Sequence, residues 1–139
     1  MHSLDEVELA EVIEKHSIAR NIITNVLIEV NLAGEKTKNG ILAEKLDNLV
    51  SEMNKFKRIS LKGLMAMPPL GTDNRKYFKQ LKELLGGINN KSIYRQKLSV
   101  LSMGTSGDFE TAIEEGATII RLGTVIFGNR PSKLTKLNR

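Results

Sequence analysis

Apolar residues recur along the first half of the chain with a helical period, then a strand-like run, then a helical period again. Ser3 followed three positions later by Glu6 resembles a capping box, so we expect a helix over residues 4–20. The β-branched run at 25–32 predicts a strand. A polar loop follows it, and the apolar face over 42–56 predicts a second helix.

The second half continues this alternation. Strands are expected at 59–66, 97–101 and 118–122, helices at 74–86 and 109–115, and turns at 104–108 and 125–127. Pro68-Pro69 ends the first of these strands, Asp73 is placed to cap the following helix, and Gly86-Gly87 is expected to end it. The chain therefore runs helix then strand, four times over.

This regular alternation favours parallel strands joined by right-handed crossovers. Two α/β architectures satisfy it: a small doubly wound sheet, and part of a (β/α) barrel. The hydrophobic period alone does not separate them. In both, ligands bind beyond the carboxyl ends of the strands, which limits where a site can lie.

Composition is that of an ordinary globular domain, with 139 residues, 40% of them apolar and 27% charged. The absence of cysteine excludes disulfides and thiolate chemistry and fits a reducing, cytoplasmic location. No apolar run reaches about 18 residues, so no transmembrane helix is expected. The acidic, amphipathic start does not read as a signal peptide.

The formal net charge of +5 raises the question of a polyanionic partner. The basic residues are scattered, however, with a loose cluster only in the tail at Arg130, Lys133, Lys136 and Arg139. Four Phe, two Tyr and no Trp leave few platforms for base stacking. Solvated lysines explain the charge better than nucleic-acid binding does.

Two loops rich in small and hydroxylated residues follow the last two expected strands. Thr105-Ser106 lies in the first and Gly123-Thr124 in the second. Small residues let backbone N–H groups approach an anion, and the hydroxyls add donors, so the pair resembles a phosphate site. Taken singly, each has a simpler explanation: a turn after a strand at Gly123-Thr124, and a helix cap at Ser106.

Arg121 interrupts the apolar run at 118–122. A buried arginine needs a partner, so it either pairs with a core carboxylate, faces solvent, or points into a ligand site. His2 and His16 are isolated, and no group of residues has metal-ligand spacing or forms a nucleophile–base pair.

Several segments in collinear order resemble one known family. They are MHSLD (1–5), VLIEVN (26–31), KTKNGI (36–41), LKGLMAMP (61–68), LSMGTSGD (101–108), AIEEGA (112–117) and IRLGTVIFGNR (120–130). They are similar to the C-terminal half of the YggS/PROSC family of pyridoxal 5′-phosphate (PLP) homeostasis proteins. That family is a single (β/α)8 barrel, similar to the N-terminal domain of alanine racemase. The resemblance implies a partial barrel, made of about the last four to five βα units.

The resemblance also implies a PLP site. Ser106, Gly123 and Thr124 match phosphate-binding positions, and Arg121 matches the arginine that faces the pyridine nitrogen. Asn31, Met65 and Met103 match positions that line the ring side of the pocket. Thr105 stands where the family more often has Met, which leaves its role open. Residues 1–130 would form the barrel part and 131–139 a polar tail.

The family's Schiff-base lysine belongs to a segment with no counterpart here, so the resemblance implies a non-catalytic fragment that holds PLP without a covalent bond. An open half-barrel exposes two sheet edges, which predicts self-association or pairing with a separately encoded N-terminal half. Three rivals remain: a racemase- or decarboxylase-like enzyme, an anion- or nucleic-acid-binding α/β domain, and a truncated remnant without function.

Overall fold

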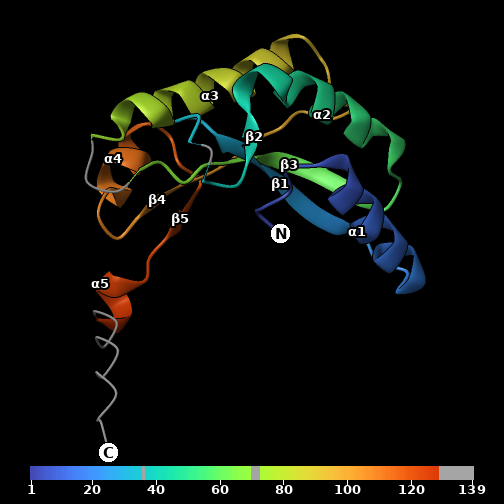
Figure 1. Ribbon diagram of the computed structural model, residues 1–139, viewed down its shortest axis with the longest axis horizontal. Coiled ribbons are helices and arrows are strands. Elements are labelled where there is room, and N and C mark those ends of the chain that lie inside the picture. The colour runs from blue at the N-terminus through green and yellow to red at the C-terminus, as the bar shows by residue number, and fades with distance from the viewer. Residues whose placement is uncertain (36, 70–72, 129–139) are drawn as a thin grey trace, which may run out of the picture.

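Five parallel strands and their helices make up the fold, described by a computed structural model for residues 1–35, 37–69 and 73–128 (Figure 1). The elements in chain order are α1 (Val7–Ala19), β1 (Thr24–Asn31), β2 (Ile41–Leu42), α2 (Leu46–Glu52), β3 (Ile59–Met65), α3 (Arg75–Asn90), β4 (Val100–Thr105), α4 (Phe109–Glu114), β5 (Ile119–Arg121) and α5 (Thr124–Phe127). Short 3-10 turns, Ala43–Lys45 and Met53–Lys55, flank α2. The sheet order is β2-β1-β3-β4-β5. The expected α/β class with parallel strands is confirmed.

The first four residues run beside β1 as an additional extended segment. Leu4 forms a parallel bridge with Ile28, and the N–H of Leu27 donates to the carbonyl of Met1 at 2.9 Å. Helix α1 therefore begins only at Val7, and its cap residue makes no side-chain capping bond. The predicted capping box at Ser3 is wrong, because the backbone of residues 1–4 pairs with β1 instead of beginning a helix.

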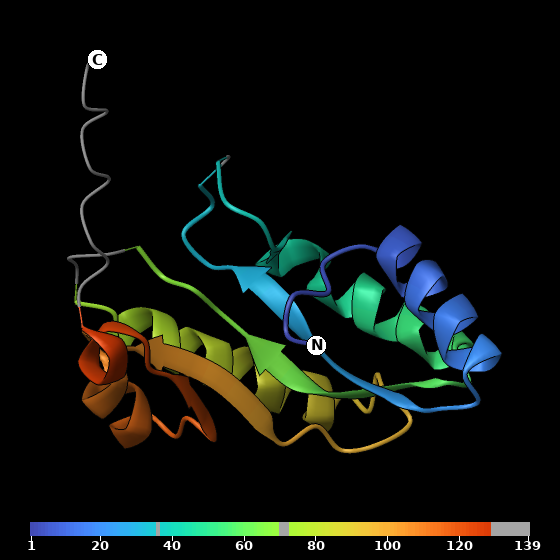
Figure 2. The ribbon, with the colours of Figure 1, turned by 90° about the horizontal axis from the view of Figure 1, so that it is seen from below.

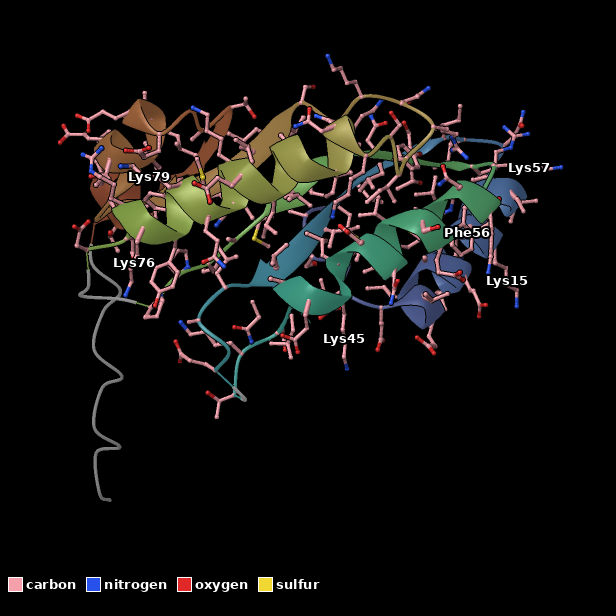
Figure 3. The ribbon with its side chains drawn as sticks, turned by 90° about the horizontal axis from the view of Figure 1, so that it is seen from above. Lys15, Lys45, Phe56, Lys57, Lys76 and Lys79 are labelled. Atoms are coloured by element: carbon pink, nitrogen blue, oxygen red, sulfur yellow. The ribbon has the colours of Figure 1, made fainter. Side chains whose placement is uncertain are left out.

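One face of the sheet packs against the helices and forms the hydrophobic core. Strand residues Val26, Ile28, Leu61, Leu64, Leu101 and Met103 meet helix residues Ala10, Leu49, Val50, Phe78, Leu81 and Ala112 there. Seen from above, α2 and α3 lie in front of the strands (Figure 3), and from below the strands lie in front (Figure 2). We call the helix-packed side the covered face and the other side the open face.

A bulge between β1 and β3 shifts which residues of β3 face the core. Val26 pairs with Leu61 but Leu27 pairs with Gly63, so Lys62 is the extra residue. The extra residue lets Leu61 and Leu64, three positions apart, both join the core cluster. Met65 then belongs to the open face, with Leu27 of β1; both are buried but lie outside that cluster.

A contact across the open face shows that the sheet is strongly curved. Nδ1 of His2 lies 3.1 Å from Oγ of Ser102, although β1 and β3 separate the two segments in the sheet. Three strand spacings would place the two backbones about 14 Å apart in a flat sheet, beyond the reach of these side chains. The sheet must therefore curl around its open face, as a barrel wall does. Curvature and helices on one face favour the partial barrel over the doubly wound sheet.

Two glycine predictions fail in the second half of the chain. Helix α3 continues through Gly86 and Gly87 to Asn90, because Leu85 and Ile88 keep its apolar face in the core. Tertiary packing there outweighs the poor helix propensity of glycine. Strand β4 begins at Val100 and includes Gly104, whose φ of +93° and close approach to Ala112 fit the strand tightly against α4.

Other elements match expectation within a few residues, except that a short edge strand and 3-10 turns divide the helix expected over 42–56. The apolar turn expected at 125–127 is the short helix α5. The expected tail, 131–139, and the basic cluster from Arg130 to Arg139 lie outside the described residues. Within the described part of the chain, no helix has the length and apolar character required to cross a membrane.

Candidate functional site

The loops that follow β4 and β5 meet at the carboxyl end of the sheet. Oγ of Ser106 accepts hydrogen bonds from the backbone N–H groups of Gly123 at 3.1 Å and Val125 at 3.3 Å. Thr124 lies between these two residues as the first residue of α5, and its side chain is exposed. The two hydroxyl-containing loops predicted from sequence therefore converge, and two N–H donors already point at one oxygen atom.

Asp108 holds the first of these loops in place. Its carboxylate accepts bonds from the N–H of Thr105 at 2.6 Å, the hydroxyl of Thr105 at 3.1 Å and the side-chain amide of Asn74 at 2.7 Å. The hydroxyl proton of Thr105 is therefore engaged inside the loop, which makes Thr105 a brace of the loop in this structure. Ser106 does not cap α4, since Asp108 occupies the cap position.

Arg121, the last residue of β5, reaches over β4 towards the end of β3. Its Nη1 donates to Oγ of Ser102 at 2.6 Å, and its Nη2 donates to the carbonyl of Ala66 at 3.0 Å. In the described ranges no carboxylate forms a salt bridge with it. Of the alternatives left open by the sequence, the ion pair with a core carboxylate is therefore not adopted. The guanidinium is half-buried on the open face.

The electrostatic surroundings of Arg121 include carboxylates at longer range. Burial lowers the pKa of Arg121, and the charges of Glu29 and Asp108 oppose that shift. Burial also raises the pKa of Glu29, with a further contribution from Asp5, while Arg121 acts in the opposite direction. An arginine still remains protonated at any physiological pH. The open face thus carries a fixed cation beside a carboxyl group that is costly to ionise.

The residues expected to line the ring side of a pocket separate into three outcomes. Met65 lies on the open face, four residues before Pro69, and is 4% exposed. Met103 is fully buried in the core cluster on the covered face, so that prediction is wrong; strand alternation turns it away from Ser102 and Arg121. Asn31 donates its side-chain amide to the carbonyls of Glu35 and Lys38, which closes its own loop.

Three residues on the open face were not predicted from sequence: His2, Glu29 and Ser102. Ser102 is fully buried and lies between Leu101 and Met103, which both point into the core. Side chains alternate between the two faces along a strand, so a polar residue between two core residues is expected on the face opposite the core. This alternation could have identified Ser102. His2 carried no such signal, because its position depends on residues 1–4 pairing with β1.

Metal-ligating side chains do not cluster in the described ranges. No group of three or more His, Asp or Glu side chains there could hold a metal ion. Of the exposed lysines labelled in Figure 3, Lys76 and Lys79 lie on α3, Lys15 lies on α1, and Lys45 and Lys57 lie near the two ends of α2. The concentrated polar chemistry lies instead at the carboxyl ends of β4 and β5.

Comparison with known proteins assigns the chain to a family. Residues 1–131 match the family model described as alanine racemase, N-terminal domain. The chain belongs to the alanine racemase N-terminal domain family. Within it, the chain is 45% identical over 133 residues to a pyridoxal phosphate homeostasis protein of Aquifex aeolicus, an alignment covering 94% of this chain and 58% of that protein. The same name is borne by a relative from Escherichia coli, 32% identical over 129 residues and 55% covered.

Solved structures of the family agree with this assignment. PipY of Synechococcus elongatus, solved with PLP bound, superposes with a TM-score of 0.82 at 27% identity, over 91% of this chain and 59% of that one. An alanine racemase of Clostridium difficile shares the fold, with a TM-score of 0.69 at 15% identity over 94% of this chain and 36% of that one. The expected resemblance and the partial (β/α) barrel are confirmed, and the chain spans little more than half the length of its homeostasis relatives.

Proposed function

We propose that this chain supplies the phosphate-binding and ring-nitrogen-binding part of a PLP site in a protein of vitamin B6 homeostasis. The observation that carries the proposal is the convergence of the N–H groups of Gly123 and Val125 on Oγ of Ser106. Backbone N–H groups and hydroxyls that meet after the last strands of a barrel are a common means of binding a phosphate group. PLP bound to the related PipY supports the identity of the ligand.

The donors present fit a phosphate group. Ser106 and Thr124 would hold it through their hydroxyls, and Gly123 through its backbone N–H, which would change partner from Oγ of Ser106 to the phosphate. Gly123 has no Cβ, and nothing lies within 4 Å of where one would be, so an anion can approach the backbone there. The brace from Asp108 to Thr105 keeps the Ser106 loop in place before any ligand arrives. Asn31, Met65 and Thr105 as PLP contacts stay predictions.

Arg121 would face the pyridine nitrogen. An arginine offers only N–H donors, so the nitrogen opposite it must remain unprotonated to accept a hydrogen bond. PLP when bound supplies a reactive aldehyde and an electron-withdrawing ring, and an unprotonated nitrogen weakens that ring as an electron sink. Such a ring is less suited to reactions that need a strong electron sink. The names of the homeostasis relatives likewise specify no reaction. We therefore propose a non-catalytic role.

The open face and the outer edge of β5 are the surfaces we propose for a partner. The sheet order places β5 at one end of the sheet, where its outer edge has no strand beside it in the described residues. A second copy of this chain, or a separately encoded N-terminal half that brings the remaining strands, would cover both surfaces. A single monodisperse monomer in sedimentation velocity would contradict this part of the proposal. Cytoplasmic location stays a prediction.

Absorbance titration with PLP, with and without borohydride, tests the function directly. We expect saturable binding that leaves no reducible lysine adduct on this chain, and about tenfold weaker binding by Ser106→Ala, since a bond to a charged phosphate is lost. Ser51→Ala, an exposed serine on α2, is the matched control and should bind like the wild type. A reducible adduct would favour the racemase- or decarboxylase-like enzyme, and absence of binding would favour the truncated remnant. Steeply salt-dependent binding of nucleic acid would favour the anion- or nucleic-acid-binding domain.

A further inference from the structure

A chain of hydrogen bonds on the open face joins three residues from three parts of the sequence. Nη1 of Arg121 donates to Oγ of Ser102 at 2.6 Å, and Nδ1 of His2 lies 3.1 Å from the same oxygen. Nη2 of Arg121 donates to the carbonyl of Ala66 at 3.0 Å. Ser102, at the centre, is 0% exposed. A polar side chain so deeply buried is retained at a cost unless its hydrogen bonds are made, and here they are.

The chemistry of the guanidinium fixes the direction of one link in this chain of hydrogen bonds. A guanidinium can only donate, so Oγ of Ser102 is the acceptor for Arg121. Oγ of Ser102 keeps a second lone pair and its own proton, so Nδ1 of His2 can either accept that proton, as a neutral imidazole protonated on Nε2 would, or donate to Oγ. The surroundings favour the neutral imidazole, because burial, the terminal amine and Arg121 all lower the pKa of His2.

Two anchors on different nitrogens orient the whole guanidinium. The group is planar and rigid, so fixing Nη1 on Ser102 and Nη2 on Ala66 also fixes the directions of the remaining N–H bonds. Those bonds, on Nε and on each terminal nitrogen, have no other partner in the part of the chain that the structure describes. Ala66 anchors through its backbone and cannot be varied by substitution, whereas Ser102 anchors through its side chain.

We propose that Ser102 is the positioning residue of Arg121, and that His2 acts through Ser102 by holding its hydroxyl in the direction that leaves a lone pair for the guanidinium. This inference rests on the proposed function for the identity of the ligand and adds what determines selectivity. An arginine held in one orientation binds more tightly a ring that presents a hydrogen-bond acceptor opposite its N–H groups. Loss of the Ser102 hydroxyl leaves the guanidinium free to rotate. The ring nitrogen should then no longer contribute to binding affinity.

The first test needs no ligand. Nitrogen-15 NMR of the protein, with a C-terminal tag so that Met1 stays in place, should show slowly rotating Nη protons for Arg121, identified by their loss in Arg121→Lys. We expect Ser102→Ala to collapse these signals and Ser102→Thr, which keeps a hydroxyl, to restore them. His2→Leu should weaken them, and His2→Asn, which keeps an acceptor near the Nδ1 position, should not. Unchanged signals in Ser102→Ala would overturn the proposal.

The second test compares PLP with its carbocyclic analogue, in which C–H replaces the ring nitrogen. We expect the wild type to prefer PLP by about tenfold, the equivalent of one charge-assisted hydrogen bond. Ser102→Ala should reduce that preference to near unity and leave affinity for inorganic phosphate unchanged. Equal losses for PLP, the analogue and phosphate would assign Ser102 a merely structural role and overturn the inference.

Failure of the proposed function would look different. A wild type that binds neither PLP nor the analogue refutes PLP binding, while the NMR comparison still decides whether Ser102 and His2 position Arg121. A variant that fails to fold is recognised by its amide spectrum. In that case Ser102→Thr against wild type, in both measurements, decides the matter, because a retained hydroxyl must then retain both the Nη signals and the preference for PLP.

Discussion

The two faces of the sheet differ in what holds them and in what they can do. On the covered face, strand residues such as Ile28 and Leu64 pack against helix residues such as Phe78 with no exposed surface. On the open face the polar side chains include Glu29, Ser102 and Arg121, which interact through hydrogen bonds and long-range charge interactions. Burial of apolar surface is the main source of folding free energy, so stability should depend mainly on the covered face.

This division teaches that substitutions on the two faces should change different measurable quantities. A residue of the covered face should change the free energy of unfolding and leave selectivity among ligands alone. A polar residue of the open face should change selectivity among ligands and have only a small effect on the free energy of unfolding. The sheet backbone is common to both faces, so damage to it should have the largest effect of all.

Gly63→Ala tests the sheet backbone, which both faces share. A Cβ at Gly63 would lie 1.9 Å from the carbonyl oxygen of Val100, its partner in β4, so β3 and β4 would have to separate. We expect a loss of more than about 4 kcal/mol in the free energy of unfolding, because strand pairing and core packing fail together. Urea denaturation followed by circular dichroism measures it, and a loss below about 1 kcal/mol would contradict the geometry.

Gly86→Ala is the matched control. Gly86 lies inside α3, and nothing is within 4 Å of the position its Cβ would take. Alanine has the better helix propensity, so the same chemical change should here stabilise the protein by up to about 1 kcal/mol. Opposite signs for one methyl group at two glycines would show that the contact with β4, and not the loss of glycine as such, is responsible.

The covered face is tested by a pair of phenylalanines. Phe78 is fully buried in the core on α3, whereas Phe127 on α5 is 85% exposed. Phe78→Ala should cost about 3–5 kcal/mol through lost burial and the cavity that remains. Phe127→Ala should change stability by no more than about 0.5 kcal/mol. Thermal and urea unfolding of both variants check this, and comparable losses would mean that α5 contributes to the core.

The sequence predicted the covered face better than the open face, for a physical reason. The bounds of β1 and β3 were predicted within a residue or so, because the apolar and β-branched residues of runs such as Val26–Val30 indicate a buried strand. The end of α3 was misplaced because glycine propensity is a local signal, and the packing of Ile88 overrides it. Local signals suffice where burial and residue type agree.

The open face depends on contacts distant in sequence, which no local pattern encodes. Ser106 and Arg121 were identified by family motifs and by an interrupted apolar run, and the convergence of their loops was expected from the parallel topology. The contact between His2 and Ser102 spans 100 positions and exists only because the sheet curls. Met103 was assigned to the wrong face because its motif position was followed without counting strand alternation.

Glu29→Gln gives the smallest expected effect and bears on the open face alone. Burial, and then Asp5, raise the pKa of Glu29 above its ordinary value of about 4.5, so the folded protein binds this proton more tightly than the unfolded chain does. A raised pKa means that the contribution of this group to stability is full below pH 4.5 and is lost as the pH rises through the folded-state pKa. At pH 7 the charged carboxylate therefore opposes folding slightly.

Glutamine keeps the shape and removes the charge, so Glu29→Gln should stabilise the protein at pH 7 by up to about 0.5 kcal/mol, a figure kept small because solvent screens a partly exposed group. The gain should vanish at pH 4, where the wild-type carboxyl is protonated too. Urea unfolding of both proteins at both pH values measures the difference, with Glu11→Gln on the exposed side of α1 as control. A loss of stability at pH 7 would show instead that Arg121 depends on the charge of Glu29, and that the open face also contributes to folding through its ions.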